Sequence, residues 1–297
     1  MLFRSAALEE RFFIETLETE RRQQSKDGTV KYLFRLPDGN CIETVLMRYS
    51  YGNTVCVSTQ VGCRMGCRFC ASTQGGRVRN LTAGEIANEV YAAARDTGER
   101  VSHIVLMGIG EPLDNFDHVM DFLSIISSPN GVNIGMRNIS LSTCGLVPMI
   151  YKLAERHLGL TLSVSLHAPT DEMRSSMMPV NDVYPVEQLI RACRDYQQET
   201  GRRVSFEYSM VNGVNDSPQT ARRLAQLIKG MGAHVNLIPI NPVDGSPYSA
   251  TDAANVKRFQ TLLTELGVNA TVRRRLGTDI SAACGQLRRE AKGGTTA

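Results

Sequence analysis

The sequence contains no run of 18 apolar residues, so it predicts no transmembrane helix. Residues 1–22 carry several acidic side chains and no small-residue cleavage site, so we expect no signal peptide. Without a secretory signal, the eight cysteines are not expected to form a disulfide framework. We therefore expect a cytoplasmic protein without membrane contact, whose thiols serve metal, nucleophilic or redox chemistry.

The sequence is also short of net charge and of lysine. Its formal net charge is only +3, a weak indication of nucleic-acid binding. Of the 33 basic residues, 6 are lysines and 27 are arginines, with arginine clusters at 273–275 and 288–289. Arginine binds phosphate bidentately and stacks on bases. Each cluster taken alone is equally consistent with a solvated surface.

Short β-branched segments alternate with longer helical segments from residue 53 onward. We expect strands at 54–58, 102–107, 138–142, 160–166, 203–209, 234–239 and 269–273, and helices near 82–97, 115–127, 147–157, 186–200, 218–230 and 252–266. This alternation predicts an α/β fold with parallel strands and right-handed crossovers. Six such units predict a partial, TIM-like (β/α)6 barrel, with ligands at the C-terminal ends of its strands.

A smaller extension is expected before the barrel. Residues 1–25 have the pattern of an amphipathic helix, and 29–36 and 41–48 that of a β-hairpin around a Pro-Asp-Gly-Asn turn. We thus divide the chain into an N-terminal extension at 1–50, a barrel core at 51–290 and a disordered tail at 291–297.

Three cysteines in a CxxxCxxC arrangement follow the first barrel strand: Cys63, Cys67 and Cys70. Three thiolates on one loop can ligate three irons of a cubane, which normally takes four cysteines. The fourth iron is then open to a substrate. A structural zinc site is the less favoured alternative, because it needs four closed ligands and usually a second Cys-x-x-C pair, which this sequence lacks.

The CxxxCxxC spacing resembles the signature of the radical S-adenosylmethionine superfamily. The resemblance implies a [4Fe–4S] cluster, held by Cys63, Cys67 and Cys70, whose open iron chelates the methionine amine and carboxylate. It also implies an electron donor such as flavodoxin or ferredoxin. The electron cleaves the sulfonium and yields a 5′-deoxyadenosyl radical.

Residues at later strand ends extend this resemblance. The residues that it implies for binding S-adenosylmethionine are Gly110, Glu111, Ser142, Ser165, Leu166, His167 and Asn241. The glycines of Gly108-Ile109-Gly110 would let the backbone approach the ligand closely. Alternatives from the residues alone stay open, because Ser142 and Ser165 can equally cap the next helix and His167 can be a packed polar residue.

Two cysteines outside the triplet indicate which family within this superfamily the sequence resembles. Cys56 lies in the first barrel strand and Cys284 in Ala282-Ala283-Cys284-Gly285-Gln286-Leu287. Taken singly, each would be a buried small apolar residue. Together, residues from about 43 to 287 closely resemble RNA adenosine methyltransferases of the RlmN and Cfr types. The Gly-Glu-Pro ending after Met107 is more similar to the RlmN type, which methylates carbon 2, than to the Cfr type, which methylates carbon 8.

Carbon 2 of adenine is electron-poor, so it cannot attack a methyl donor as a nucleophile. The resemblance implies two S-adenosylmethionine molecules per turnover. The first methylates Cys284, and the radical from the second takes a hydrogen from that methyl group before the carbon radical adds to the base. The Cys56 thiolate then attacks the Cys284 sulfur, releases the methylated base and leaves a disulfide to be reduced. Glu43 is implied as the proton acceptor, the alternative being a solvent-facing residue of an alternating strand.

The resemblance also implies an RNA partner, namely 23S rRNA and also tRNA. Arg77 and Arg79 follow the cluster loop and are the first expected RNA contacts. Two further alternatives stay open. An activase that generates a glycyl radical in a partner protein would use the triplet but neither Cys56 nor Cys284, and a non-catalytic iron–sulfur RNA-binding module would need no adenosyl site.

Overall fold

The computed structural model describes residues 16–240, 247–277, 279 and 280. Asn241, Cys284 and residues 1–15 lie outside the described residues, so what the sequence predicts for them stays a prediction. The strands are β1 Glu18–Gln24, β2 Val30–Arg35, β3 Cys41–Tyr49, β4 Gly52–Cys56, β5 Gln60–Gly62, β6 Arg77–Asn80, β7 Val101–Leu106, β8 Ile139–Thr143, β9 Thr161–Ser165, β10 Val204–Met210, β11 His234–Pro239 and β12 Asn269–Val272. The α-helices are α2 Ala83–Thr97, α3 Phe116–Ser127, α4 Val147–Ala154, α5 Asp171–Met177, α6 Val186–Thr200, α7 Pro218–Leu227 and α8 Ala253–Glu265.

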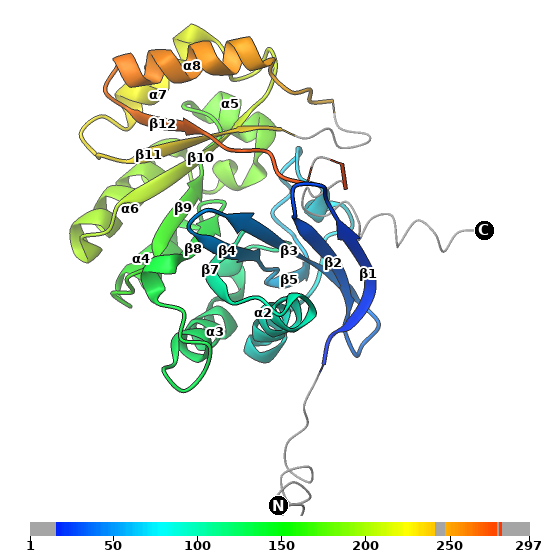
Figure 1. The fold of residues 1–297 in the computed structure, drawn as a ribbon. Helices are drawn as coiled ribbons and strands as arrows, with labels where there is room; N and C mark the ends of the chain where they lie inside the picture. Colours follow the sequence, from blue (N-terminus) through cyan, green and yellow to red (C-terminus); the bar gives the residue numbers. More distant parts are fainter. Residues whose placement is uncertain (1–15, 241–246, 278, 281–297) are drawn as a thin grey trace, which may run out of the picture.

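A ten-stranded sheet organises the described residues, in the order β1-β2-β3-β4-β7-β8-β9-β10-β11-β12. From β4 to β12 neighbouring strands pair in parallel. The helices lie along the outer side of this curved arc, which remains open because β12 and β4 do not pair (Figure 1). The structure therefore confirms the predicted partial (β/α)6 barrel, with strand positions within a few residues of those expected.

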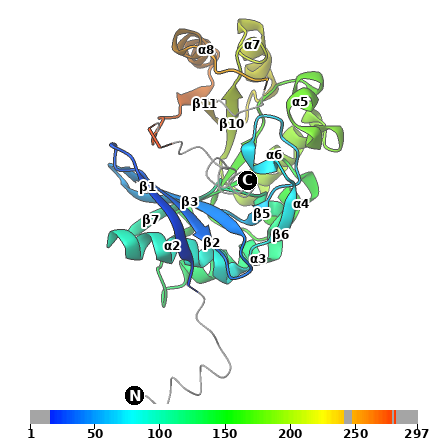
Figure 2. The same ribbon diagram turned by 90° about the vertical axis from the view of Figure 1, so that its right-hand side faces the viewer.

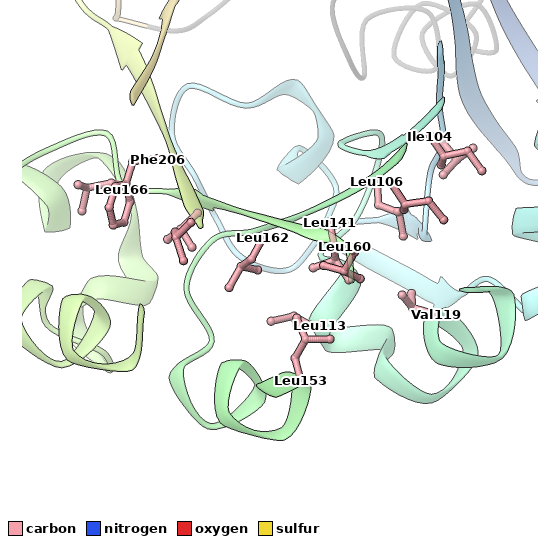
Figure 3. Packing of buried hydrophobic residues seen from close by; sticks show 14 of the residues in the cluster. Ile104, Leu106, Leu113, Val119, Leu141, Leu153, Leu160, Leu162, Leu166 and Phe206 are labelled. Carbon is pink, nitrogen blue, oxygen red and sulfur yellow. The ribbon is translucent and has the colours of Figure 1, made fainter. Parts of the chain in front are cut away.

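Apolar side chains between the arc and its helices form the core. Leu106, Leu141 and Leu162 come from three neighbouring strands, and Val119 of α3 and Leu153 of α4 lie on the helix side (Figure 3). All five are buried at 1% exposure or less. Parallel strands covered by helices exclude water from the sheet, so this core fixes where each strand ends and hence where the loop residues lie.

Part of the predicted N-terminal helix is wrong: Glu18–Gln24 is strand β1, paired antiparallel with β2. The segment contains no apolar residue that could form the buried face of a helix, and six of its seven residues are exposed. Its backbone hydrogen bonds are instead satisfied along β2, and Arg35 binds Glu20 at 2.5 Å. The predicted hairpin is confirmed as β2 and β3. Because β3 pairs with β4, the extension and the barrel share one sheet.

Two further features were not predicted from the sequence. The short strands β5 and β6 pair antiparallel and bring together the two ends of the cysteine loop. Residues 273–277, 279 and 280, here called the C-terminal strap, run from β12 to the β1–β2 turn, as both ribbon views show (Figures 1 and 2). There Asp27 Oδ2 accepts the Gly277 N–H at 2.8 Å, and Asp279 Oδ1 accepts the Ser25 hydroxyl at 2.5 Å. The strap thus spans the open side of the arc.

None of the helices in the described part of the chain is long and apolar enough to cross a membrane.

Candidate active site

One pocket collects most of the predicted site residues at the C-terminal ends of the parallel strands. Those that line it are Cys63, Cys67, Cys70, Met107, Gly110, Glu111, Ser142, Ser165 and His167. They come from the cysteine loop and from the ends of β7, β8 and β9. A parallel barrel places ligands at this end, so the pocket lies where the sequence predicts it.

The cysteine loop is held at its base and against α5. Cys63 N–H donates to the Gly76 carbonyl at 3.1 Å, and Arg68 N–H donates to the Met177 carbonyl at 2.9 Å. Burial raises the pKa of the Cys63 thiol to about 12 and that of Cys67 well above its usual range, with a further contribution from the neighbouring thiols. Thiolates in this loop therefore need a positively charged metal centre to stabilise them.

The donor set fits an iron–sulfur cluster. The three thiols interact electrostatically with one another and line a single pocket. A cluster spreads its thiolate ligands over several irons, so three thiols on one loop match the cluster that the sequence predicts.

Close chain packing requires the glycines of the Gly-x-Gly segment. A Cβ on Gly108 would lie 2.5 Å from the Val57 carbonyl oxygen, and one on Gly110 would lie 2.8 Å from the Gln60 nitrogen. Gly110 also has a φ of +112°, a region that favours glycine. The glycines therefore let the β7 end pack against the segment that follows β4, which brings Glu111 beside the cysteine loop.

Glu111 links the ends of two strands. It is buried, its Oε2 accepts the Cys144 N–H at 2.7 Å, and its Oε1 accepts the Leu113 N–H at 3.1 Å. Burial raises the pKa of this carboxyl, although these hydrogen bonds oppose the shift. The Thr143 and Cys144 side chains also hydrogen-bond to this carboxyl, so a ligand amine in the pocket would have to replace one of these side-chain bonds.

His167 presents a hydrogen-bond donor to the pocket. Its Nδ1 accepts the Ser209 N–H at 2.9 Å, and burial, together with the Arg174 charge, lowers its pKa to about 3. The ring is therefore neutral, with its proton on Nε2. The residue has a left-handed φ of 57°, and its carbonyl accepts the Asn215 side chain at 2.7 Å. Phe69 of the cysteine loop packs edge-on against the ring, with centroids 4.8 Å apart.

The neighbouring strand-end residues have different placements. Ser142 and Ser165 line the pocket, and neither caps a helix, because the N-caps of α4 and α5 are Leu146 and Thr170. The capping alternative is therefore wrong. Leu166 packs in the core, and its backbone N–H and carbonyl already bond within the protein. The structure therefore gives no direct support to Leu166 as a ligand contact.

A buried arginine behind the pocket was missed from the sequence. Arg174 of α5 has no exposed surface, and its guanidinium donates to the carbonyls of Cys144, Ser165 and Leu166. Burial lowers its pKa, while nearby thiols, led by Cys144, oppose this shift. In sequence it follows two acidic residues and reads as a solvated helix position. The structure shows that it ties the ends of β8 and β9 together.

Glu207 and Arg273 also line the pocket and were missed as site residues. Glu207 lies in β10, where every residue is buried, and its Oε2 accepts the Asn236 amide at 2.8 Å. Burial raises its pKa, and the Arg273 charge lowers it in part. A charged residue inside the otherwise uncharged strand Val204–Met210 is the sequence signal that could have indicated a site.

Glu43 and Cys56 lie outside the pocket lining, on the sheet beside it. Glu43 is only 2% exposed and pairs with Lys31 at 3.1 Å, so the solvent-facing alternative is wrong. Cys56 is half-buried at the end of β4. Burial raises the pKa of its thiol to about 11, and Arg273 is the largest opposing influence.

The two arginines expected to contact RNA first are held in ion pairs. Arg77 binds Asp114 at 2.9 Å, and Arg79 binds Asp38 at 2.6 Å and Glu85 at 2.7 Å. Their charge is therefore largely neutralised within the protein. These ion pairs make both arginines weaker candidates for RNA contacts than the sequence alone suggests.

Comparison with known proteins agrees with this geometry. The model of the Radical SAM superfamily matches residues 57–225, more than half of the chain. A Desulforamulus reducens protein named "Probable dual-specificity RNA methyltransferase RlmN" is 57% identical over 265 residues, covering 89% of this chain and 76% of that protein. A protein of the same name from Clostridium botulinum Eklund 17B is 52% identical over 285 residues, covering 96% and 82%. The crystal structure of a radical SAM methyltransferase from Sphaerobacter thermophilus has a TM-score of 0.92 at 49% identity, covering 96% of this chain and 84% of that one.

The parallel arc, the three-cysteine loop at its strand ends and the family match define a radical S-adenosylmethionine enzyme. Such an enzyme uses S-adenosylmethionine and an iron–sulfur cluster. Among these enzymes, the chain belongs to the RlmN family of RNA methyltransferases. The predicted family and enzyme class are therefore confirmed, and the glycyl-radical activase and non-catalytic module are not supported.

Proposed function

We propose that this enzyme methylates carbon 2 of an adenosine in 23S rRNA, and in tRNA, through an S-methylcysteine at Cys284. The observation that carries the proposal is the common placement of the three cluster thiols, Glu111 and His167 around one pocket. In this proposal a [4Fe–4S] cluster on Cys63, Cys67 and Cys70, with S-adenosylmethionine bound, supplies the methyl group and the adenosyl radical.

The pocket residues have separate tasks in binding S-adenosylmethionine. Glu111 accepts from the methionine amine in place of the Thr143 or Cys144 side-chain bond, and Gly110 offers backbone groups beside it. His167 Nε2–H and the Ser142 and Ser165 hydroxyls donate to ligand oxygens or nitrogens at the other strand ends. Asn241, outside the described residues, is proposed as a further contact. The support is that all of these except Asn241 line the pocket.

The chain's own residues complete the reaction on the base. Once the methylene group of Cys284 is attached to carbon 2, the adduct carries an unpaired electron. Glu43 takes the proton that leaves carbon 2, and the unpaired electron would pass to the iron–sulfur cluster, which leaves a closed-shell thioether between Cys284 and the base. The Cys56 thiolate then attacks the Cys284 sulfur, so that an S–S bond forms and the S–CH₂ bond breaks. The electron pair of that bond stays on the carbon, which takes a proton to become the methyl group. Arg273 favours this step, because its charge lowers the pKa of the Cys56 thiol.

The same steps define the expected partners and compartment. The Cys56–Cys284 disulfide has to be reduced after each turnover, which suits the reducing cytoplasm. Flavodoxin or ferredoxin is proposed as the electron donor. Arg273 at the pocket, together with the exposed Arg274 and Arg275 of the strap, is better placed for phosphate contacts than the ion-paired Arg77 and Arg79.

Nucleoside mass spectrometry tests the proposal. The reconstituted enzyme is incubated anaerobically with S-adenosylmethionine, a chemical reductant and either ribosomal RNA or tRNA lacking the modification. We expect 2-methyladenosine in the digested RNA. A product carrying 8-methyladenosine would replace the proposal by Cfr-type chemistry, and cleaved S-adenosylmethionine without any methylated nucleoside would reject both.

A further inference from the structure

A row of functional side chains crosses one face of the antiparallel extension. Val45 of β3 is the register partner of Lys31 on β2 and also of Cys56 on β4. Residues directly opposite in an antiparallel sheet point to the same face, and so do residues two apart in one strand. Lys31, Glu43, Val45 and Cys56 therefore share one face, while Ile42, Thr44 and Leu46 point to the other.

The Lys31–Glu43 ion pair on this face is deeply buried. Lys31 Nζ lies 3.1 Å from Glu43 Oε2, and the two side chains are 0% and 2% exposed. Removing both charges from water costs several kcal/mol for each ion, and apolar residues of similar volume are often equally or more stable. Stability alone is thus a weak reason for placing such a pair beside a reactive thiol.

The Glu43 charge acts on nearby thiols. Burial is the main cause that raises the pKa of the Cys56 thiol on β4 and of the Cys70 thiol in the cysteine loop, and the Glu43 charge adds a smaller contribution to both. The Arg273 charge acts on Cys56 in the opposite direction. A cation beside this carboxylate therefore limits the effect of its charge on the Cys56 thiolate.

We propose that Lys31 is the positioning residue for Glu43, holding its carboxylate ionised on the Cys56 face so that it can accept the proton from the target base. This inference rests on the function proposed above. In the proton transfer, the C–H bond at the target carbon breaks, its electron pair stays with the ring, and the proton bonds to a Glu43 oxygen, while the unpaired electron of the adduct would leave to the iron–sulfur cluster. Lys31 keeps its charge throughout and binds the carboxyl before and after the transfer.

The first test needs no cofactor. We compare infrared difference spectra of the purified wild type, Lys31→Met, Lys31→Arg and Lys31→Met/Glu43→Gln near neutral pH. A buried carboxyl that loses its cation takes up a proton instead of remaining charged. We expect a protonated-carboxyl band in Lys31→Met that is missing from the wild type, from Lys31→Arg and from the double variant.

The second test uses the cofactor-loaded enzyme. Loss of a general base lowers kcat for RNA methylation by about 10²-fold or more. We expect that loss in Lys31→Met with KM for RNA unchanged, and recovery of most of the rate in Lys31→Arg. The control is Arg48→Met on β3, the strand that also carries Glu43. This substitution removes the ion pair between Arg48 and Glu99, which are 2.8 Å apart. It should lower stability without adding the infrared band or lowering kcat.

The outcomes distinguish failure of the Lys31 proposal from failure of the proposed function. A folded Lys31→Met without the new band and with wild-type kcat would overturn the proposal. If Lys31→Met does not fold, a Lys31→Arg variant whose kcat matches that of Glu43→Gln would overturn it equally. If the wild type methylates no RNA but the band appears in Lys31→Met, the charge partnership holds and the proposed function fails.

Discussion

The two regions of the sheet present their functional groups in different ways. In the parallel arc, the site residues lie in loops at strand ends, where glycines and backbone hydrogen bonds hold them around a pocket. In the antiparallel extension, Lys31 and Glu43 lie in the middle of strands, and their position depends on register. A loop site tolerates shifts of its neighbours, whereas a one-residue slip of β3 would turn Glu43 to the opposite face. The extension is therefore the part where small changes in pairing should abolish chemistry.

We expect the largest loss of activity from substitutions in the cysteine loop of the parallel arc. Alanine at Cys63, Cys67 or Cys70 should abolish the cluster, which we expect to contain about four irons per chain, and with it all cleavage of S-adenosylmethionine. Iron analysis and absorbance after anaerobic reconstitution measure this. The control is Cys193→Ala, since Cys193 is a fully buried cysteine of α6 in the apolar core. That variant should lose stability but keep its iron. Full activity with zinc and no iron would contradict the account.

Glu111→Ala should destabilise the strand-end region. The substitution leaves the buried N–H groups of Leu113 and Cys144 without their acceptor. An unsatisfied buried donor costs about 1–3 kcal/mol, so a decrease of that order or more is expected in the free energy of unfolding by urea. Glu111→Gln, which retains one acceptor oxygen, should lose less. Equal stability of Glu111→Ala and the wild type would show that these bonds do not hold the pocket.

The strap should loosen in acid. Burial raises the pKa of Asp27, but hydrogen bonds from Gly277 and Thr29 outweigh it, so that the pKa falls from 3.8 to about 2. Because this pKa is lowered on folding, its stabilising contribution is complete above pH 3.8 and is lost as the pH falls towards 2. Hydrogen exchange at residues 273–277 should therefore accelerate in that range. Asp27→Asn should show fast exchange there already at neutral pH, and a strap equally protected in both proteins would contradict this.

The smallest effect is expected from the ion-paired arginines. Arg77→Ala and Arg79→Ala together should change RNA affinity little, because Asp114, Asp38 and Glu85 already neutralise them. Arg274→Ala should reduce the salt slope of binding by about 0.7–0.9 if it contacts one phosphate. Filter binding over a range of salt concentrations measures both. If the Arg77→Ala and Arg79→Ala pair weakens RNA binding more than Arg274→Ala does, the RNA surface lies on the β6 side of the pocket and not on the strap.

The sequence predicted the arc and the β2–β3 hairpin, but neither strand β1 nor the Lys31–Glu43 pair, for physical reasons. Strand–helix alternation and the CxxxCxxC loop are local patterns, so the barrel and the place of the cysteine loop at its strand ends could be predicted directly. Lys31 could not be recognised, because Thr29-Val30-Lys31-Tyr32 reads as an ordinary alternating strand and its partner lies twelve residues away in another strand. Arg174 was missed because most of its partners are backbone carbonyls, which no sequence pattern reveals. The β1 strand was missed because its pairing with β2 decides its structure.

The cysteine pair provides the most direct test of the central claim that this enzyme methylates RNA through a protein thioether. Cys56→Ala and Cys284→Ala are each incubated with RNA under turnover conditions and analysed on a denaturing gel. The account predicts RNA covalently attached to Cys56→Ala, which cannot release the base, and none on Cys284→Ala, which cannot attach it. Cys284→Ala should still bind the cluster. The same gel pattern for both variants, or normal turnover by either, would contradict the account.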